Sequence, residues 1–144
     1  MRFKKANGVF SQYILEVKDI IAQKLPPTLG DLKQAIMREY NQVNQMIFKV
    51  GVIEQKVNIF DNNILILAKH RRISVLKIID ESDGALSNTV DRILIEKSKA
   101  LLQKNFGERF GFEIQLIIKD YIASKEMSVT LILLDKNVEE YLTG

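Results

Sequence analysis

Residues 86–134 read LSNTVDRILIEKSKALLQKNFGERFGFEIQLIIKDYIASKEMSVTLILL, and this stretch predicts a long helix, a glycine stop and a β-hairpin. The helix is expected to begin at Ser87 or Asn88, since both residue types are good N-caps. Gly107 and Gly111 are expected to end it, because glycine enters the left-handed cap conformation without a Cβ penalty. The apolar positions at three- and four-residue spacing are Val90, Ile93, Leu94 and Leu101. That spacing predicts one apolar stripe and one solvated face.

The predicted hairpin follows the two glycines. Residues 112–119 alternate between apolar and polar side chains, which predicts a half-buried strand. Residues 124–126 form the expected turn. The return strand at 127–134 is apolar almost throughout, which is typical of a central strand covered on both faces. We therefore expect the long helix to lie on one face of the sheet that this hairpin helps to build.

The rest of the chain predicts further helices and a second hairpin. Pro26 and Pro27 separate the first two helices, because proline cannot donate to the helical hydrogen-bond ladder and disfavours helix in the residue before it. The remaining predicted elements are helices at 9–25, 28–50 and 73–79, strands at 53–59 and 64–68 joined by the turn Asp61-Asn62-Asn63, and a short turn at 138–142.

Runs of helix and hairpin, rather than alternating single units, predict the α+β class. We expect a two-layer sandwich whose four-stranded, mainly antiparallel sheet consists of two hairpins, with a long packed helix and N-terminal helices. Residues 1–27 are expected to be an N-terminal extension with an amphipathic helix. Residues 28–144 are expected to form a single α+β domain.

The composition is typical of a soluble globular protein. The chain has 144 residues, of which 47% are hydrophobic and 27% charged, and it is long enough to bury its own core. It has no cysteine, which excludes disulfides, thiolate nucleophiles and zinc ribbons and allows a reducing compartment. No apolar run approaches the ~20 residues of a membrane-spanning helix, and the N-terminus lacks the apolar segment of a signal peptide. We expect a cytoplasmic protein that holds no cofactor.

The net charge of +3 is unevenly distributed. Residues 1–30 hold five Lys/Arg and two Asp/Glu, whereas residues 31–144 hold sixteen of each. A nucleic-acid-binding protein normally carries its basic surplus on a folded face. The charge pattern therefore disfavours a nucleic-acid partner, although a nucleic-acid-binding module remains the alternative function. It would use the basic N-terminus (Arg2, Lys4, Lys5) and a second basic cluster further along the chain.

That second cluster consists of Lys69, His70, Arg71 and Arg72 at the end of a predicted strand. Adjacent donors at a strand-to-helix junction can converge on a phosphate or a carboxylate, so the cluster is a candidate site for an anion or an acidic partner. A small-molecule sensor with its anion site here is a further hypothesis. The competing interpretation is a solvated edge that discourages pairing between sheets.

Catalytic and metal chemistry have little support in the sequence. The single histidine and the lack of cysteine remove the usual transition-metal ligand sets. A Ser-His-Asp arrangement would have to use His70, whose neighbours in sequence are cations that would lower its pKa and offer no orienting carboxylate. No phosphate-cradling loop is present, since the glycines at 107 and 111 are not followed by a lysine and a helix. We expect no enzyme activity and no metal site.

Self-association is the leading expectation. The apolar stripes of the first two helices look too extensive for one small sheet to cover, and the near-heptad spacing of the second could pair it with another subunit. The predicted interface residues are Phe10, Ile14, Val17, Ile21, Leu32, Ile36, Tyr40 and Val43. We expect a homo-oligomer, with a dimer favoured.

The order of elements, the polar turn at 61–63 and the ending at 129–135 (VTLILLD) resemble the MpsC-like family, over roughly residues 29–141. This is a small bacterial domain, formerly of unknown function, linked to a sodium-translocating system that generates membrane potential. The chain departs from the family in two places. Lys49-Val50-Gly51 replaces its Gly-Arg-Gly-Pro stretch, and Arg72-Ile73-Ser74 replaces its leucine-threonine start to the short helix.

The resemblance implies a non-catalytic, soluble accessory or regulatory domain that interacts with other proteins. It implies a membrane-transport protein as a partner, in a system that moves an ion or bicarbonate, and no insertion into the membrane. It implies no catalytic residue.

Overall fold

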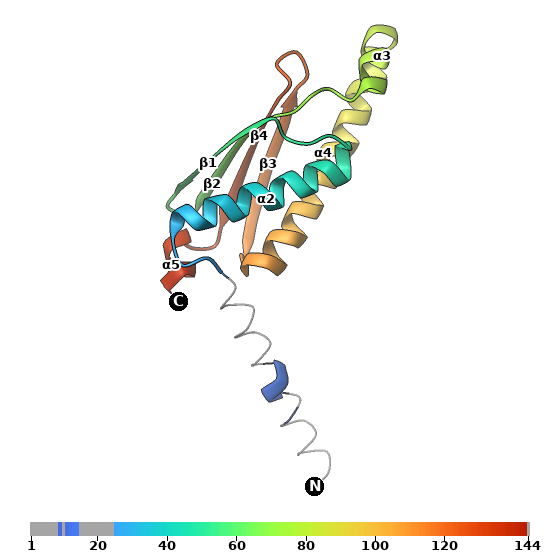
Figure 1. Ribbon diagram of the computed structural model, residues 1–144. Helices are drawn as coiled ribbons and strands as arrows, with labels where there is room; N and C mark the ends of the chain where they lie inside the picture. Colours follow the sequence, from blue (N-terminus) through green and yellow to red (C-terminus); the bar gives the residue numbers. More distant parts are fainter. Residues whose placement is uncertain (1–8, 10, 15–24, 144) are drawn as a thin grey trace.

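The computed structural model describes residues 9, 11–14 and 25–143. The elements run in the order α2 (Leu29–Phe48), β1 (Glu54–Phe60), β2 (Asn63–Lys69), α3 (Ser74–Ser82), α4 (Gly84–Phe110), β3 (Ile114–Ile122), β4 (Met127–Leu134) and α5 (Val138–Thr143) (Figure 1). The predicted order of helices and hairpins from residue 28 onward is confirmed. The helix predicted at 9–25 lies largely outside the described residues, and within it Val9 and residues 11–14 are helical.

The four strands form one antiparallel sheet in the order β1-β2-β4-β3. Each hairpin pairs its own two strands, and the hairpins meet where β2 pairs with β4. The return strand therefore lies inside the sheet, as its apolar sequence predicts. The predicted α+β class and two-layer sandwich are confirmed.

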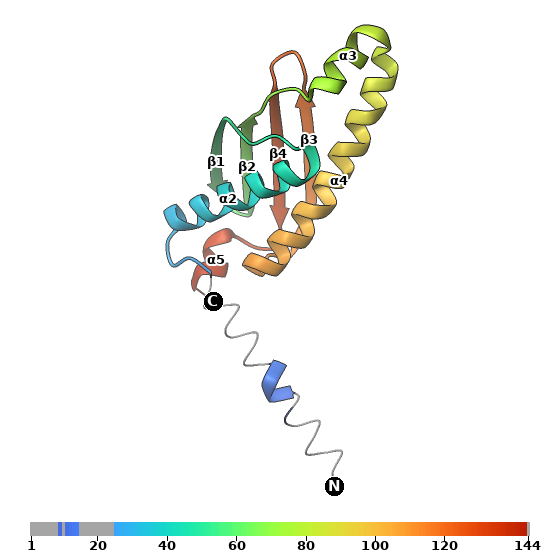
Figure 2. The ribbon, with the colours of Figure 1, turned by 45° about the vertical axis from the view of Figure 1, so that its right-hand side comes forward.

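Two helices cover one face of this sheet (Figures 1 and 2). Strand residues alternate between the two faces, so that Ile64 and Ile66 of β2 and Ile132 of β4 point toward the helices and are fully buried. The helices contribute the other half of the core, with Leu32, Ile36, Tyr40 and Val43 from α2 and Leu102, Phe106 and Phe110 from α4. The core of the protein therefore lies on one side of the sheet, between the strands and the two helices.

The ends of α2 follow local rules of helix capping. Thr28 accepts a hydrogen bond from the backbone N–H of Asp31 (3.1 Å) and caps the N-terminus. Lys49 caps the C-terminus in the left-handed region, with φ of 60°.

Helix α4 begins earlier than expected. Its N-cap is Asp83, which accepts from the backbone N–H of Leu86 (3.1 Å), so the predicted start at Ser87 or Asn88 is wrong. An Asp cap four residues upstream satisfies the free N–H groups equally well. Gly107 lies inside the helix, and Gly111 alone ends it with φ of 70°.

The predicted apolar stripe of α4 is wrong at Ile93, whereas Val90, Leu94 and Leu101 are half-buried. Ile93 is 54% exposed, and the buried positions are instead Ser87, Ser98, Leu102, Phe106 and Phe110. Figure 2 shows the reason, because α3 and the first half of α4 extend past the end of the sheet. Among the described elements, only α3 packs against this part of α4, which leaves little surface on which to bury a full apolar stripe.

The expectation that β4 is covered on both faces is not met within the described residues. Val129 lies in the middle of the strand and is 41% exposed, whereas its neighbours Ser128 and Thr130 are fully buried. The helices cover only the face to which Ser128 and Thr130 belong. In the part of the chain that the structure describes, the opposite face of the sheet is open.

Candidate interaction surface and the polar network behind it

The open sheet face is the surface opposite α2 and α4. Strand alternation and the register of pairing place every second side chain of each strand on it. Its apolar members are Phe60 from β1, Leu65 and Leu67 from β2, Leu116, Ile118 and Ile122 from β3, and Met127, Val129, Leu131 and Leu133 from β4.

These side chains form one continuous apolar surface. Leu131 lies between Leu65 on one side and Ile118 on the other, directly paired across β2, β4 and β3. Ile118 is 53% exposed and Leu116 is 48% exposed. Contiguous apolar surface of this kind is uncommon on monomeric proteins and marks sites of interaction.

Charged side chains border this surface on both edge strands. Glu54 and Lys56 project from β1, and Asp120 projects from β3. At the β1 border lies a hollow of about 430 Å³ lined by Glu54, Gln55, Lys56, Leu67, Lys69 and Met127. The open sheet face thus has an apolar centre and a polar rim, the usual anatomy of a protein interface.

On the covered side of the same sheet, a lysine is buried. Lys119 of β3 is 7% exposed, and its Nζ donates a hydrogen bond to Tyr40 Oη on α2 (2.8 Å). Tyr40 Oη also lies 2.8 Å from Ser128 Oγ. Burial raises the pKa of Tyr40, but the charge of Lys119 and the hydrogen bonds of Lys119 and Ser128 outweigh burial and leave that pKa below its usual value.

The sole histidine lies beside this network. His70 is 1% exposed and stacks on Tyr121, with ring centroids 4.6 Å apart, and it contacts Phe48 in a tilted arrangement at 5.1 Å. Neither of its ring nitrogens has a hydrogen-bond partner among the described residues. Burial lowers the pKa of His70, and the charges of Lys119 and Arg72 lower it further. Burial is thus the larger cause, and of the two cations only Arg72 is a neighbour of His70 in sequence.

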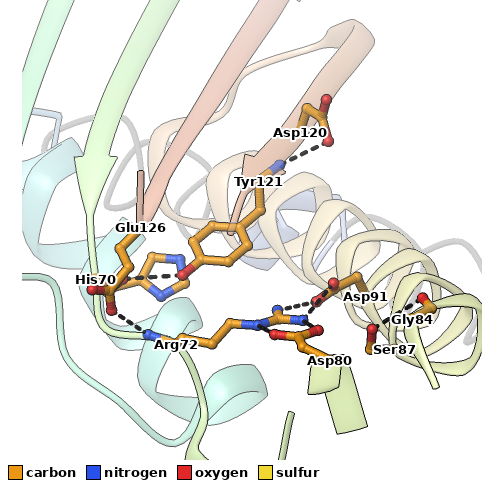
Figure 3. A network of polar contacts seen from close by, with 9 residues as sticks. All are labelled: His70, Arg72, Asp80, Gly84, Ser87, Asp91, Asp120, Tyr121 and Glu126. Carbon is orange, nitrogen blue, oxygen red and sulfur yellow. Dashed lines mark hydrogen bonds and ion pairs between the residues drawn. The ribbon is translucent and has the colours of Figure 1, made fainter. Parts of the chain in front are cut away.

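Arg72 ties the β2–α3 loop to two helices (Figure 3). Its guanidinium donates to Asp80 of α3 (2.8 and 3.0 Å) and to Asp91 of α4 (2.5 and 2.9 Å). Its backbone N–H donates to the carboxylate of Glu126 (2.6 Å). The hydrogen bonds from Arg72 lower the pKa of Asp80 to about 2, and the two carboxylates raise the pKa of Arg72 above its usual value. This contact holds the projecting α3–α4 arm against the strands.

The structure does not bring the four predicted anion-site residues to one surface. His70 and Arg72 are buried, and the guanidinium of Arg72 already contacts two carboxylates. Lys69 and Arg71 are exposed. The solvated-edge interpretation is wrong for His70 and Arg72 for the same reason. The four residues therefore do not present one shared binding surface.

Exposed cations gather instead around a different hollow. It has a volume of about 390 Å³ and is lined by Phe48, Lys49, Val50, Arg71, Arg72, Ile73, Ser74, Val75 and Lys77. Of the predicted cluster, Arg71 and Arg72 line it, and Lys49 and Lys77 join them from α2 and α3. These two lysines are far from the cluster in sequence, so local spacing gave no signal for them.

The α2 half of the predicted oligomer interface is wrong. Leu32, Ile36, Tyr40 and Val43 are all buried in the core of their own chain, where the sheet covers them. Ile14 is 38% exposed. Phe10, Val17 and Ile21 lie outside the described residues.

The open sheet face is the surface that sequence reasoning missed. Strand β4 is apolar at nearly every position, and such a run is normally buried on both sides. The sequence contains more apolar residues than one covered sheet face requires, and this excess could have indicated the open sheet face. The sequence interpretation assigned the excess to the helices. In the described structure, no helix or strand covers the second face of β4.

The described residues contain no group of three or more His, Asp or Glu side chains that could hold a metal ion. Among the helices that the structure describes, none combines the length and the hydrophobicity that a bilayer span requires.

Comparisons with known proteins return nothing for this chain: no family model, no curated protein and no solved structure matches it. The resemblance to the MpsC-like family stays a prediction.

Proposed function

We propose that this protein is a non-catalytic accessory or regulatory module that works by binding other proteins and by associating with copies of itself. The open sheet face is the observation that carries the proposal. Its centre is apolar over β2, β4 and β3, and side chains such as Ile118, at 53% exposure, remain in contact with water in the isolated chain. Removing such surface from water is the main driving force of protein association.

The same surface accounts for the composition of β4. A strand that faced solvent on one side would normally carry polar residues there. Met127, Val129, Leu131 and Leu133 occupy those positions instead. Apolar residues on an open face of a sheet promote aggregation unless a defined partner covers them.

The identity of the cellular system rests on the family resemblance. An MpsC-like domain would serve a membrane system that transports an ion or bicarbonate, acting from the cytoplasm. The open sheet face then offers the surface through which such a partner, or a second copy, binds.

The test uses two isoleucines matched in exposure. Ile118 on the open sheet face is 53% exposed, and Ile93 on α4 is 54% exposed. Light scattering at micromolar concentration should give an oligomer for the wild-type protein and for Ile93→Lys, and a monomer for Ile118→Lys. A wild-type protein that is strictly monomeric, or an Ile118→Lys variant that associates normally, would contradict the proposal.

Anion binding is a second candidate function, favoured by the hollow that Lys49, Arg71 and Lys77 line together. Three cationic side chains around one concavity attract phosphate or carboxylate groups. Phosphate or bicarbonate should raise the melting temperature above that in chloride of equal ionic strength. Arg71→Gln should abolish this difference, and an equal melting temperature in all three salts would rule the function out.

A further inference from the structure

We propose that the partner on the open sheet face is the same face of a second copy, so that two sheets stack between outer layers of helices. This inference rests on the proposed function and specifies its geometry. The dimer has a two-fold axis parallel to the strands. Strand β1 then lies over β3 of the partner, and β2 lies over β4 of the partner.

The size of the face suits such a dimer. Four strands spaced about 4.8 Å apart, with a rise of about 3.3 Å per residue, give a face of about 19 by 25 Å, or roughly 500 Å². Two copies together bury roughly 1,000 Å² in projection, which reaches the lower bound for a specific interface. Stacked sheets pack about 10 Å apart, and their inner side chains interdigitate.

A single helix is a poorer cover than a second sheet. On the other face of the same sheet, two helices of 20 and 27 residues together cover the strands, with α2 over β1 and α4 over β3. The predicted amphipathic helix at 9–25 would be shorter than either of them. Because a helix is about 10 Å wide, it would cover about two strands and leave the rest of the apolar surface in water.

The charges on the rim select the orientation. The strand register places Lys56, Leu67, Val129 and Asp120 in one row across the open sheet face, from the β1 edge to the β3 edge. An axis parallel to the strands reverses this row in the second copy. Lys56 then faces the partner's Asp120, and Asp120 faces the partner's Lys56, while the two apolar residues meet in the centre.

The neighbouring row contains Asn58, Leu65, Leu131 and Ile118, and it is reversed in the same way. Leu65 then lies against the partner's Leu131 in the centre, and Asn58 lies over the partner's Ile118 at the edge. Stacked sheets cross at about 30°, which displaces the edge strands by about one residue. The long side chain of Lys56 can span that displacement.

The other in-plane axis, which runs across the strands, is disfavoured. It would place each strand over the same strand of the partner. The row that contains Lys56 and Asp120 would then face the partner's row that contains Asn58 and Ile118. Asp120 would then lie over the partner's Ile118, and a carboxylate would lose water without gaining a cation. A charge desolvated without a partner is costly. The axis parallel to the strands leaves one such contact, Glu54 over the partner's Ile122, but it also forms two reciprocal ion pairs between Lys56 and Asp120, so it is preferred.

Charge reversal in the whole 144-residue chain tests this geometry. Lys56→Glu and Asp120→Lys should each weaken dimerisation by at least about tenfold, because each places like charges opposite one another at two symmetric positions. The double variant Lys56→Glu/Asp120→Lys has the wild-type net charge and should restore the wild-type dissociation constant. Lys97→Glu, an exposed position on α4, is the control for charge alone and should leave it unchanged.

A cysteine variant supplies a second measurement. The chain contains no cysteine, so Leu131→Cys introduces a single thiol close to the proposed axis. A short bifunctional maleimide should give a covalent dimer of this variant, because two such thiols on sheets about 10 Å apart are too distant for a direct disulfide. Lys97→Cys should give no covalent dimer under the same conditions.

The outcomes separate this inference from the proposed function. If Ile118→Lys dissociates the protein but the charge variants have no effect, the function stands and the stacked geometry is wrong. If Ile14→Lys dissociates the protein and the charge variants do not, the N-terminal segment is the partner and the inference is overturned. Restoration by the double variant together with a Leu131→Cys cross-link supports the stacked dimer.

Discussion

Lys119 Nζ donates a 2.8 Å hydrogen bond to Tyr40 Oη in the interior of the protein, joining β3 to α2 behind the open sheet face. The ammonium also lies 4.7 Å from the centre of the Tyr40 ring and 5.6 Å from that of Phe48. Among the described residues, no carboxylate forms an ion pair with Lys119. A buried cation is thus stabilised by a hydroxyl group and two aromatic rings.

This contact predicts an unusual order of mutational effects. Tyr40→Phe leaves a buried ammonium without its oxygen acceptor and should lower the free energy of unfolding by about 1–3 kcal/mol. Lys119→Met removes the charge, keeps the apolar stem and should change that free energy by less than about 1 kcal/mol. Urea denaturation of both variants measures the difference. A larger loss for Lys119→Met than for Tyr40→Phe would contradict the prediction.

His70 should make the folded state sensitive to mild acid. Its pKa is lowered in the folded protein, so below the ordinary value of 6.5 the unfolded chain binds the proton more readily. Stability should therefore be complete above pH 6.5 and decline as the pH falls below it. His70→Phe keeps a ring between Phe48 and Tyr121 and should flatten the stability profile between about pH 6.5 and 5. A variant with the wild-type slope in this range would show that His70 is not the cause.

Arg72 should contribute far more to the free energy of unfolding than its neighbour Arg71. Arg72→Met leaves the carboxylates of Asp80 and Asp91 without their cation. Asp80 is exposed, so the loss comes from the more enclosed Asp91 and should be about 3 kcal/mol. Arg71→Met, at an exposed position, should cost less than about 0.5 kcal/mol. Thermal or urea unfolding compares the two, and equal losses would refute the structural role of Arg72.

The two left-handed helix caps should respond in opposite directions to glycine. Lys49 ends α2 with φ of 60°, and Gly111 ends α4 with φ of 70°. Lys49→Gly should raise the free energy of unfolding by up to about 1 kcal/mol, because glycine adopts this conformation without strain. Gly111→Ala should lower it by about 1 kcal/mol. Changes of the same sign in both variants would be inconsistent with these backbone conformations.

Local chemistry was sufficient to predict the elements of this fold. The limits of β4 follow from its apolar run, and the end of α4 follows from the glycine at 111. Pairing of the strands as two hairpins follows from the turns at 61–63 and 124–126. Each of these features depends on residues within a few positions of one another.

The faces of the elements could not be predicted in the same way. His70 and Arg71 are adjacent, yet one is buried among aromatic rings and the other is exposed, because the sheet and α2 happen to cover only one of them. The carboxylates of Asp80 and Asp91 that hold Arg72 lie 8 and 19 residues away. Such partners become neighbours only when α3 and α4 pack beside the strands.

The sequence by itself determined where helices and strands form and that their total apolar surface exceeds one small core. Only the tertiary structure decided where the excess lies. Both helices pack on the same side of the sheet, so the stripe of α2 at Leu32 and Ile36 disappears into the core and the alternate residues of β4, such as Val129, are left outside. Periodicity is a property of each segment, whereas the choice of which face is covered depends on how all the segments pack together.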